Sequence, residues 1–153
     1  MSNGIVLQRE VRHLNTRIAM LSQEQVKKVK YTSNERIRFT VQPSAGLWQG
    51  RRVIFEVKVP CRYPSAVCEV RCLSNVRHPN IFGSAVCLSS LEEDWRPEMR
   101  LEDYVMGVLF LMHNPNFEDP LCDAFYGLSL EAAMALVQRP LLLEQPVEVL
   151  PSL

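Results

Sequence analysis

The apolar residues between Ile5 and Leu21 recur at alternating steps of four and three, which places them on one face of a helix. We therefore predict a single helix over Ile5–Leu21. Its opposite face carries charged residues, among them Arg9, Arg12 and His13, and is either solvated or a docking surface for a partner. The apolar residues are Leu7, Val11, Leu14, Ile18 and Leu21.

Four shorter runs follow and predict β-strands, because their apolar residues tend to alternate with other positions. In the third run Val53, Phe55 and Val57 alternate strictly, and charged residues such as Glu56 fill positions between them. We expect an antiparallel meander with one wet face, which holds Glu56, and one face covered by the first helix. The runs are Val26–Tyr31, Ile37–Val41, Arg52–Val59 and Glu69–Leu73.

Helical spacing returns in two later segments. Leu101–His113 combines an apolar stripe with two acidic residues in its first turn, where negative charge suits the helix dipole. A last helix is predicted from Ser129, a candidate cap, to Gln138. The pattern thus predicts one α+β domain over residues 1–153, with an N-terminal helix, a four-stranded antiparallel meander and C-terminal helices.

Charge and hydropathy restrict the function classes. The 153 residues include 17 Lys plus Arg and 17 Asp plus Glu, so there is no basic field for nucleic acid. The longest apolar stretch lies within Val105–Met112, far short of the roughly 20 residues that span a bilayer, and no secretion signal is evident. We expect a soluble intracellular protein, located in the cytoplasm, the nucleus or both, that acts on protein partners or a small substrate, without nucleic acid or membrane.

The cysteines are expected to be free thiols, because their number is odd and no export signal is evident. No pair has CxxC spacing and His78 has no second histidine beside it, so we predict no metal site and no cofactor. Cys72 alternates with Val70 and is expected in the core. The five are Cys61, Cys68, Cys72, Cys87 and Cys122.

The segment from Ser74 to Glu98 is irregular and too long for a bare connection in a compact domain. It contains three short motifs, and a fourth follows the helix Leu101–His113. One helix, four strands and these motifs, in this order, resemble the ubiquitin-conjugating enzymes from Leu7 to about Gln145. The motifs are His78-Pro79-Asn80, Cys87-Leu88, Trp95-Arg96-Pro97 and Asn116-Phe117-Glu118-Asp119-Pro120-Leu121.

Within that family the chain is most similar to the branch that conjugates the neddylation modifier, through Cys87–Pro97, Asn116–Leu121 and Glu69–Leu73. The resemblance implies that Cys87 accepts the modifier as a thioester and passes it to a substrate lysine, since a thiolate both attacks and leaves well. Ubiquitin itself is the alternative modifier, and an inactive binding scaffold is the alternative function. A cysteine hydrolase using Cys87 and His78 is a third interpretation, although no group is evident to orient the histidine.

The resemblance also implies roles for residues around Cys87. His78 and Pro79 are expected to be structural, with His78 bracing the segment through backbone hydrogen bonds. Asn80 is expected to hold its loop or to stabilise an oxyanion, for which an amide N–H is suited. Asp119 is expected to orient the lysine and favour loss of its proton in a partly desolvated cleft. The plainer alternatives are a turn residue for Asn80 and a capping residue for Asp119.

Docking surfaces follow from the same resemblance. The basic face of the first helix is expected to bind the activating enzyme, and two loops are expected to bind a RING-type ligase. The remaining partners are the ubiquitin-like modifier and the substrate lysine. The activating-enzyme residues are Arg9, Arg12 and His13, and the ligase residues are Tyr63, Pro64, Trp95 and Pro97.

The chain also departs from the family pattern. Only eight residues separate His78 from Cys87, one fewer than usual, so the loop must tighten near Gly83. Tyr63-Pro64 is followed by Ser-Ala-Val-Cys where the family usually has a large residue and a Pro-Pro pair, and Glu98 stands where a small residue is common. Extra residues lie at about Cys122–Leu128. We therefore expect standard partners to bind differently or weakly.

Overall fold

The computed structural model describes residues 3–88 and 93–139, which form an α+β unit as predicted. The predicted domain of residues 1–153 includes segments outside the described residues, so its extent stays a prediction. The helices are α1 (Asn3–Asn15), α2 (Ile18–Leu21), α4 (Leu101–His113), the short 3-10 helix η1 (Asp123–Phe125) and α5 (Leu130–Gln138). The strands are β1 (Val29–Thr32), β2 (Arg36–Val41), β3 (Val53–Lys58), β4 (Glu69–Cys72), β5 (Ile81–Phe82) and β6 (Ala85–Val86).

The strands form one sheet in the order β1-β2-β3-β4-β6-β5, with every neighbouring pair antiparallel. The first four are the predicted meander. The two-residue strands β5 and β6 were not predicted, because they are too short to show a period. Gly83 begins the turn between them at φ +60°, a conformation that favours glycine in two-residue hairpins. This tight turn accommodates the short spacing between His78 and Cys87.

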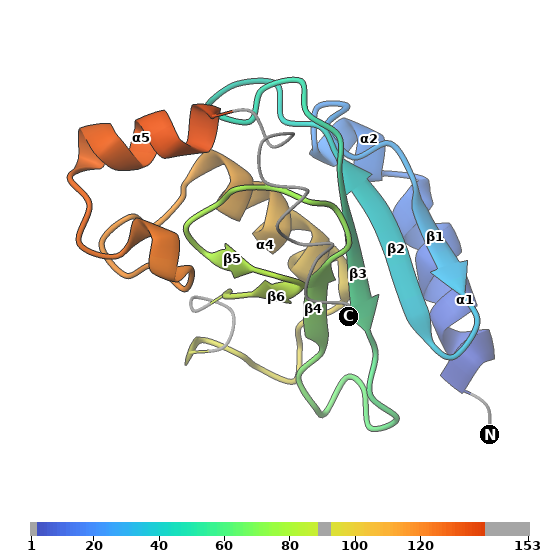
Figure 1. Cartoon of the computed structure of the whole chain (residues 1–153). Helices are drawn as coiled ribbons and strands as arrows, with labels where there is room; N and C mark the ends of the chain where they lie inside the picture. Colours follow the sequence, from blue (N-terminus) through green and yellow to red (C-terminus); the bar gives the residue numbers. More distant parts are fainter. Residues whose placement is uncertain (1–2, 89–92, 140–153) are drawn as a thin grey trace, which may run out of the picture.

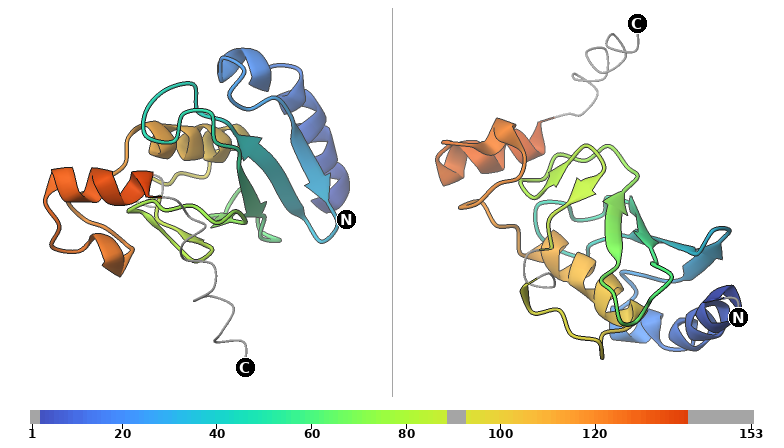
Figure 2. Two further views of the ribbon diagram at one scale, coloured as in Figure 1. Left: turned by 45° about the horizontal axis from the view of Figure 1, so that its top comes forward. Right: turned by 90° about the horizontal axis from the view of Figure 1, so that it is seen from below.

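Helices α1 and α4 cover the same face of the sheet (Figures 1 and 2). Helix α1 packs against β1 and contacts α4. The core joins both helices to the apolar face of the strands, and it includes Leu7, Val11, Phe39, Phe55 and Tyr104. The predicted covering of one sheet face by the first helix is therefore confirmed.

The prediction of one continuous helix over Ile5–Leu21 is wrong, because α1 ends at Asn15. The Asn15 side chain donates a hydrogen bond to the Val29 carbonyl and accepts one from the Val29 N–H, both at 2.7 Å. Such bonds between a side chain and a distant backbone compete with helix continuation. They attach the end of α1 to the start of β1.

Two expectations about the strands also need correction. Val26 lies before β1, because its N–H and carbonyl both bond to the hydroxyl of Ser22. Glu56 is only 3% exposed, although the alternation places it on the wet face. Its carboxylate accepts a hydrogen bond from Arg38 Nε at 2.8 Å and lies 3.5 Å from Arg36 Nη1, which compensates for burial of its charge.

The later helices agree with the sequence pattern. Helix α4 has the predicted bounds, and the Asp103 carboxylate accepts a hydrogen bond from the Arg100 N–H at its start. Helix α5 begins directly after Ser129, whose hydroxyl accepts from the Ala132 N–H at 3.1 Å. Within the described part of the chain, no helix is long and apolar enough to cross a membrane.

Candidate active site

His78 anchors the irregular segment and is completely buried. Its Nδ1 accepts a hydrogen bond from the Asn80 N–H at 2.9 Å, so Nε2 carries the proton and donates to the Leu111 carbonyl at 3.2 Å. The imidazole stacks on Trp48 with 4.4 Å between ring centroids. The Trp48 indole in turn donates to the Arg77 carbonyl at 3.0 Å. His78 thus joins its bend to α4 through backbone hydrogen bonds.

Both nitrogens of His78 are engaged with backbone groups, so neither is placed to deprotonate the Cys87 thiol. A hydrolase would need a histidine that accepts the proton of its nucleophile. The geometry therefore argues against the cysteine hydrolase interpretation.

The burial of His78 predicts a pH dependence of stability. Desolvation lowers its pKa from 6.5 to about 4, so in this range the unfolded chain binds more protons than the folded protein. The free energy of unfolding should therefore fall as the pH decreases from about 6.5 to 4, with His78 contributing about 3 kcal/mol.

Urea unfolding of the wild type and of His78→Gln at several pH values would measure this contribution. The substitution should cost stability at pH 7 and flatten the dependence, so that the two curves approach each other toward pH 4. Parallel curves over this range would contradict the account of His78.

The Asn80 side chain closes onto the loop of residues 116–119. Its Nδ2 donates to the carbonyls of Asn116 and Asp119 at 3.0 and 3.4 Å, and its Oδ1 accepts from the Asn116 N–H at 2.8 Å. Because an amide has two N–H donors, both are engaged. Of the two roles expected for Asn80, this geometry favours holding the loop, since donation to an oxyanion would require one of these bonds to open.

Cys87 follows β6 directly and is half-buried. Its N–H donates to the Asn80 carbonyl at 2.9 Å, and the next residue, Leu88, is buried. The backbone on both sides is thus attached to the folded domain, while the side chain is partly accessible. This arrangement fixes a thiol beside the Asn80 segment.

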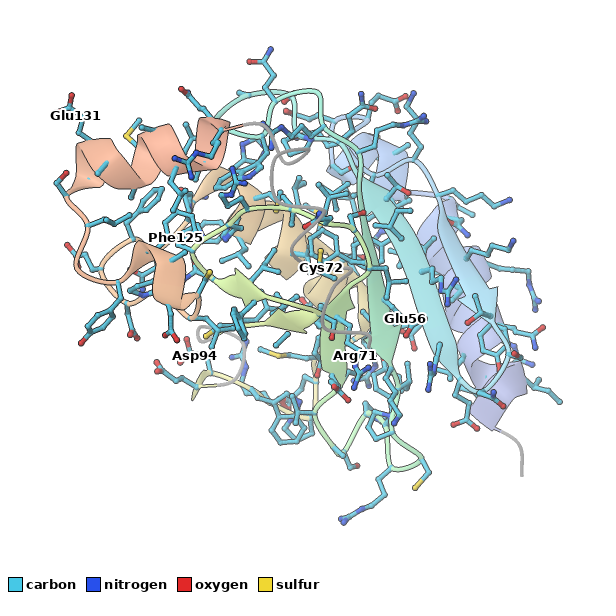
Figure 3. All side chains as sticks on the ribbon, viewed as in Figure 1. Glu56, Arg71, Cys72, Asp94, Phe125 and Glu131 are labelled. Carbon is cyan, nitrogen blue, oxygen red and sulfur yellow. The ribbon has the colours of Figure 1, made fainter. Side chains whose placement is uncertain are left out.

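The other four thiols lie in different surroundings. Cys61 is exposed and Cys122 is half-buried. Cys68 and Cys72 are buried, and Cys72 lies in the core as predicted (Figure 3). Burial raises the pKa of Cys68 to about 12 and also raises that of Cys72, which disfavours the reactive thiolate. Among the described residues, no group of three or more His, Cys, Asp or Glu is placed to hold a metal.

The loop that carries Asp119 is bonded through its backbone to the segment of Pro79 and Asn80. The Asp119 carbonyl accepts from Asn80, and the N–H groups of Leu121 and Cys122 donate to the Pro79 carbonyl at 2.7 and 3.1 Å. The structure thereby brings together the segments that carry Asn80, Cys87 and Asp119. The Asp119 side chain is exposed, so the partly desolvated surroundings expected for it are not present in the isolated chain.

The residues expected to bind the activating enzyme and the ligase differ in their exposure to solvent. Arg9, Arg12 and His13 are all exposed on α1, and Pro97 is also exposed. Pro64 and Trp95 are half-buried, and the Trp95 side chain bonds to Tyr104. Tyr63 is also half-buried, and its hydroxyl is engaged within the molecule.

The Tyr63 hydroxyl donates to the Glu10 carboxylate at 2.7 Å and accepts from the Leu101 N–H at 2.9 Å. Burial and the bond to Glu10 raise the pKa of Tyr63. The same Glu10 oxygen accepts from Leu101 N–H at 2.9 Å, which links α1 to the start of α4. The sequence pattern did not indicate this role of Glu10, because its partners lie far away along the chain.

Comparison with known proteins identifies the family of the chain. Residues 6–137 match the family model described as ubiquitin-conjugating enzyme. Since the match covers most of the chain, the chain belongs to the ubiquitin-conjugating enzyme family.

Several relatives are named as NEDD8-conjugating enzymes. The chain is 34% identical over 113 residues to UBC12 of Kluyveromyces lactis, a match that covers 73% of this chain and 58% of that protein. It is 38% identical over 85 residues to UbcE2M of Drosophila melanogaster, with 55% and 47% covered. The chain spans about half the length of the curated relatives it matches.

Solved structures share the fold. The structure of S. cerevisiae Ubc12 is 33% identical and has a TM-score of 0.60, covering 67% of this chain and 56% of that one. A putative ubiquitin conjugating enzyme from Plasmodium yoelii is only 16% identical but has a TM-score of 0.74 over 90% and 92% of the two chains. This second match supports the fold alone.

Proposed function

We propose that this chain carries a ubiquitin-like modifier as a thioester on Cys87 and transfers it to a substrate lysine, in the neddylation branch. The observation that carries the proposal is the half-buried Cys87, whose backbone is bonded to Asn80 within the His-Pro-Asn segment. The choice of modifier is supported by the relatives named as NEDD8-conjugating enzymes.

The first chemical step is an exchange of thioesters. The Cys87 thiolate attacks the carbonyl carbon that joins the modifier to the activating enzyme, and the activating enzyme's thiolate leaves. Because one thioester replaces another, the step needs no large change in free energy. ATP is consumed by the activating enzyme, and this chain needs no metal or small-molecule cofactor.

In the second step, a neutral lysine amine attacks the same carbonyl carbon and Cys87 leaves as a thiolate. An isopeptide bond forms, and the amine loses a proton. Asp119 orients the incoming lysine, and the bound substrate excludes water from this exposed carboxylate, which favours the loss of that proton. Asn80 keeps the loop with Asp119 against the segment with Cys87.

The partners in this proposal bind different surfaces. The activating enzyme binds the exposed residues Arg9, Arg12 and His13, and a RING-type ligase binds the loops that expose Pro97 and partly expose Pro64. The inward hydroxyl of Tyr63 gives that residue a supporting role beneath the ligase surface. The reaction takes place in the cytoplasm, the nucleus or both.

Charge reversal on α1 should slow charging by the activating enzyme. The double substitution Arg9→Glu and Arg12→Glu is expected to reduce the charging rate by about tenfold and make it less sensitive to salt, because peripheral charges mainly set association rates. Discharge of the purified thioester to free lysine should be unchanged. Rates at several salt concentrations would measure both effects.

The matched control is Lys27→Glu with Lys28→Glu, which makes the same change in net charge at two exposed residues outside α1. This control should charge at nearly the wild-type rate. Equal slowing in both double variants would show that net charge, and not docking on α1, is responsible.

The proposed function is tested by incubating the chain with ATP and either NEDD8 or ubiquitin, each with its own activating enzyme. We expect an adduct with NEDD8 that is removed by a reducing agent. An adduct with ubiquitin alone would support the alternative modifier, and no adduct with either would support a binding scaffold.

A further inference from the structure

The extra segment between Asp119 and α5 exposes apolar side chains beside the candidate active site. Phe125, labelled in Figure 3, is buried. It packs against Phe117 with 6.2 Å between ring centroids, which fixes the segment to the domain. Tyr126, the next residue, is 78% exposed, and Leu130, the first residue of α5, is 61% exposed. Exposed apolar side chains that lie together typically mark an interaction site.

These side chains line a groove of about 600 Å³. Glu118 and Pro120, on either side of Asp119, form part of its wall, and Tyr126 and Leu130 form another part. The Leu121 N–H donates a hydrogen bond to the Pro79 carbonyl at 2.7 Å, which holds Leu121 next to this wall. The groove therefore begins at the loop that the Asn80 side chain attaches to the Cys87 segment.

The surroundings of the groove are acidic. Between Arg100 and Arg139 the sequence contains six Asp and Glu residues and no Lys or Arg, although the chain as a whole is formally neutral. Four of the six are exposed: one of them, Glu118, lines the groove, and each of the other three is within two residues of a lining residue along the chain. Glu131 extends from α5 in Figure 3. The four are Glu118, Asp119, Asp123 and Glu131.

We propose that this groove binds the substrate segment that contains the acceptor lysine, and that it selects an apolar side chain flanked by basic residues. The inference rests on the proposed function only in that the bound lysine is the acceptor. An aromatic and aliphatic groove takes an apolar anchor, and the acidic surroundings attract a basic segment and disfavour an acidic one. The groove thus adds substrate selectivity beside the thioester.

Binding to the uncharged chain tests the groove without any chemistry. The probe is a fluorescent peptide with one lysine, two leucines and several arginines, and fluorescence anisotropy measures its affinity. One twin peptide has glutamates for the arginines, and another has serines for the leucines. We expect both twins to bind at least tenfold more weakly.

Variants of the chain locate the bound peptide. Tyr126→Ser with Leu130→Ser should weaken binding about tenfold, as expected when an interface loses an aromatic anchor. Asp123→Lys with Glu131→Lys should weaken binding and reduce its dependence on salt. The matched control is Met20→Ser on α2, which removes an apolar side chain of similar exposure (76%) and should change nothing.

Discharge of the purified thioester then connects the groove to transfer. The Tyr126→Ser and Leu130→Ser variant should transfer the modifier to the basic peptide about tenfold more slowly, and to free lysine at the wild-type rate. Equal binding of the basic and acidic peptides, or no effect of the groove variants, would overturn the inference. The inference would also be overturned if the groove variants left peptide binding unchanged and weakened self-association, or binding of the modifier or the ligase. If no thioester forms, the proposed function fails, but the anisotropy result still decides whether the groove binds basic apolar segments.

Discussion

Replacing Cys87 by serine should abolish the reducible adduct completely. The serine hydroxyl attacks the modifier's thioester less readily than a thiolate, and any product is an oxygen ester. Since an alkoxide leaves far less readily than a thiolate, this ester should resist reducing agents, yield to hydroxylamine and fail to pass the modifier to lysine. Charging reactions separated on gels with and without a reducing agent would measure the change.

Single serine substitutions of the other four cysteines are the controls. Cys122→Ser is the closest match, because Cys122 is also half-buried and its backbone is bonded to Pro79. It should charge normally. The substitutions of the buried Cys68 and Cys72 should lower stability without removing the adduct. A reducible adduct on Cys87→Ser would show that another thiol accepts the modifier.

Loss of the Asn80 amide or the Asp119 carboxylate should affect discharge more than charging, because both are proposed to act when an amine attacks. Asn80→Ala removes the three hydrogen bonds that hold the 116–119 loop. We expect discharge to slow by on the order of 10², equivalent to about 2.7 kcal/mol, for Asp119→Ala, which removes the carboxylate that favours proton loss, and by a similar factor for Asn80→Ala, which releases the loop that positions this carboxylate. Single-turnover discharge from the purified thioester measures this rate.

Asn116→Ala is the matched control for the loop. Asn80 bonds to the backbone of Asn116, so this substitution keeps all three Asn80 bonds. It removes only the bond from the Glu118 N–H to Asn116 Oδ1 at 3.1 Å, and it should discharge much faster than Asn80→Ala. Unfolding curves for each variant separate chemistry from stability. Equal losses in charging and discharge, together with reduced stability, would indicate that Asn80 or Asp119 serves only the fold.

The fold was predictable where local pattern decides it. Helix α4 has its predicted bounds, because its apolar stripe and the acidic residues of its first turn agree. The end of the first helix at Asn15 was not predictable from local pattern, because it depends on hydrogen bonds to Val29 on another element. Glu56 was misplaced for a similar reason, since Arg36 and Arg38 on the neighbouring strand compensate its burial.

The candidate site was predictable as a set of motifs and not as a set of contacts. The order of the motifs indicated Cys87, Asn80 and Asp119, and the structure brings their segments together through backbone bonds. The engagement of both Asn80 N–H groups depends on the path of a loop 36 residues away, which no local pattern encodes. The link between Tyr63 and Glu10 is likewise a product of packing between distant elements.

The most direct measurement is intact mass spectrometry of the chain after charging with NEDD8, its activating enzyme and ATP, followed by peptide mapping. We expect one added modifier, attached to Cys87 and removed by a reducing agent. No adduct, or an adduct that resists reduction or maps to another cysteine, would contradict this expectation.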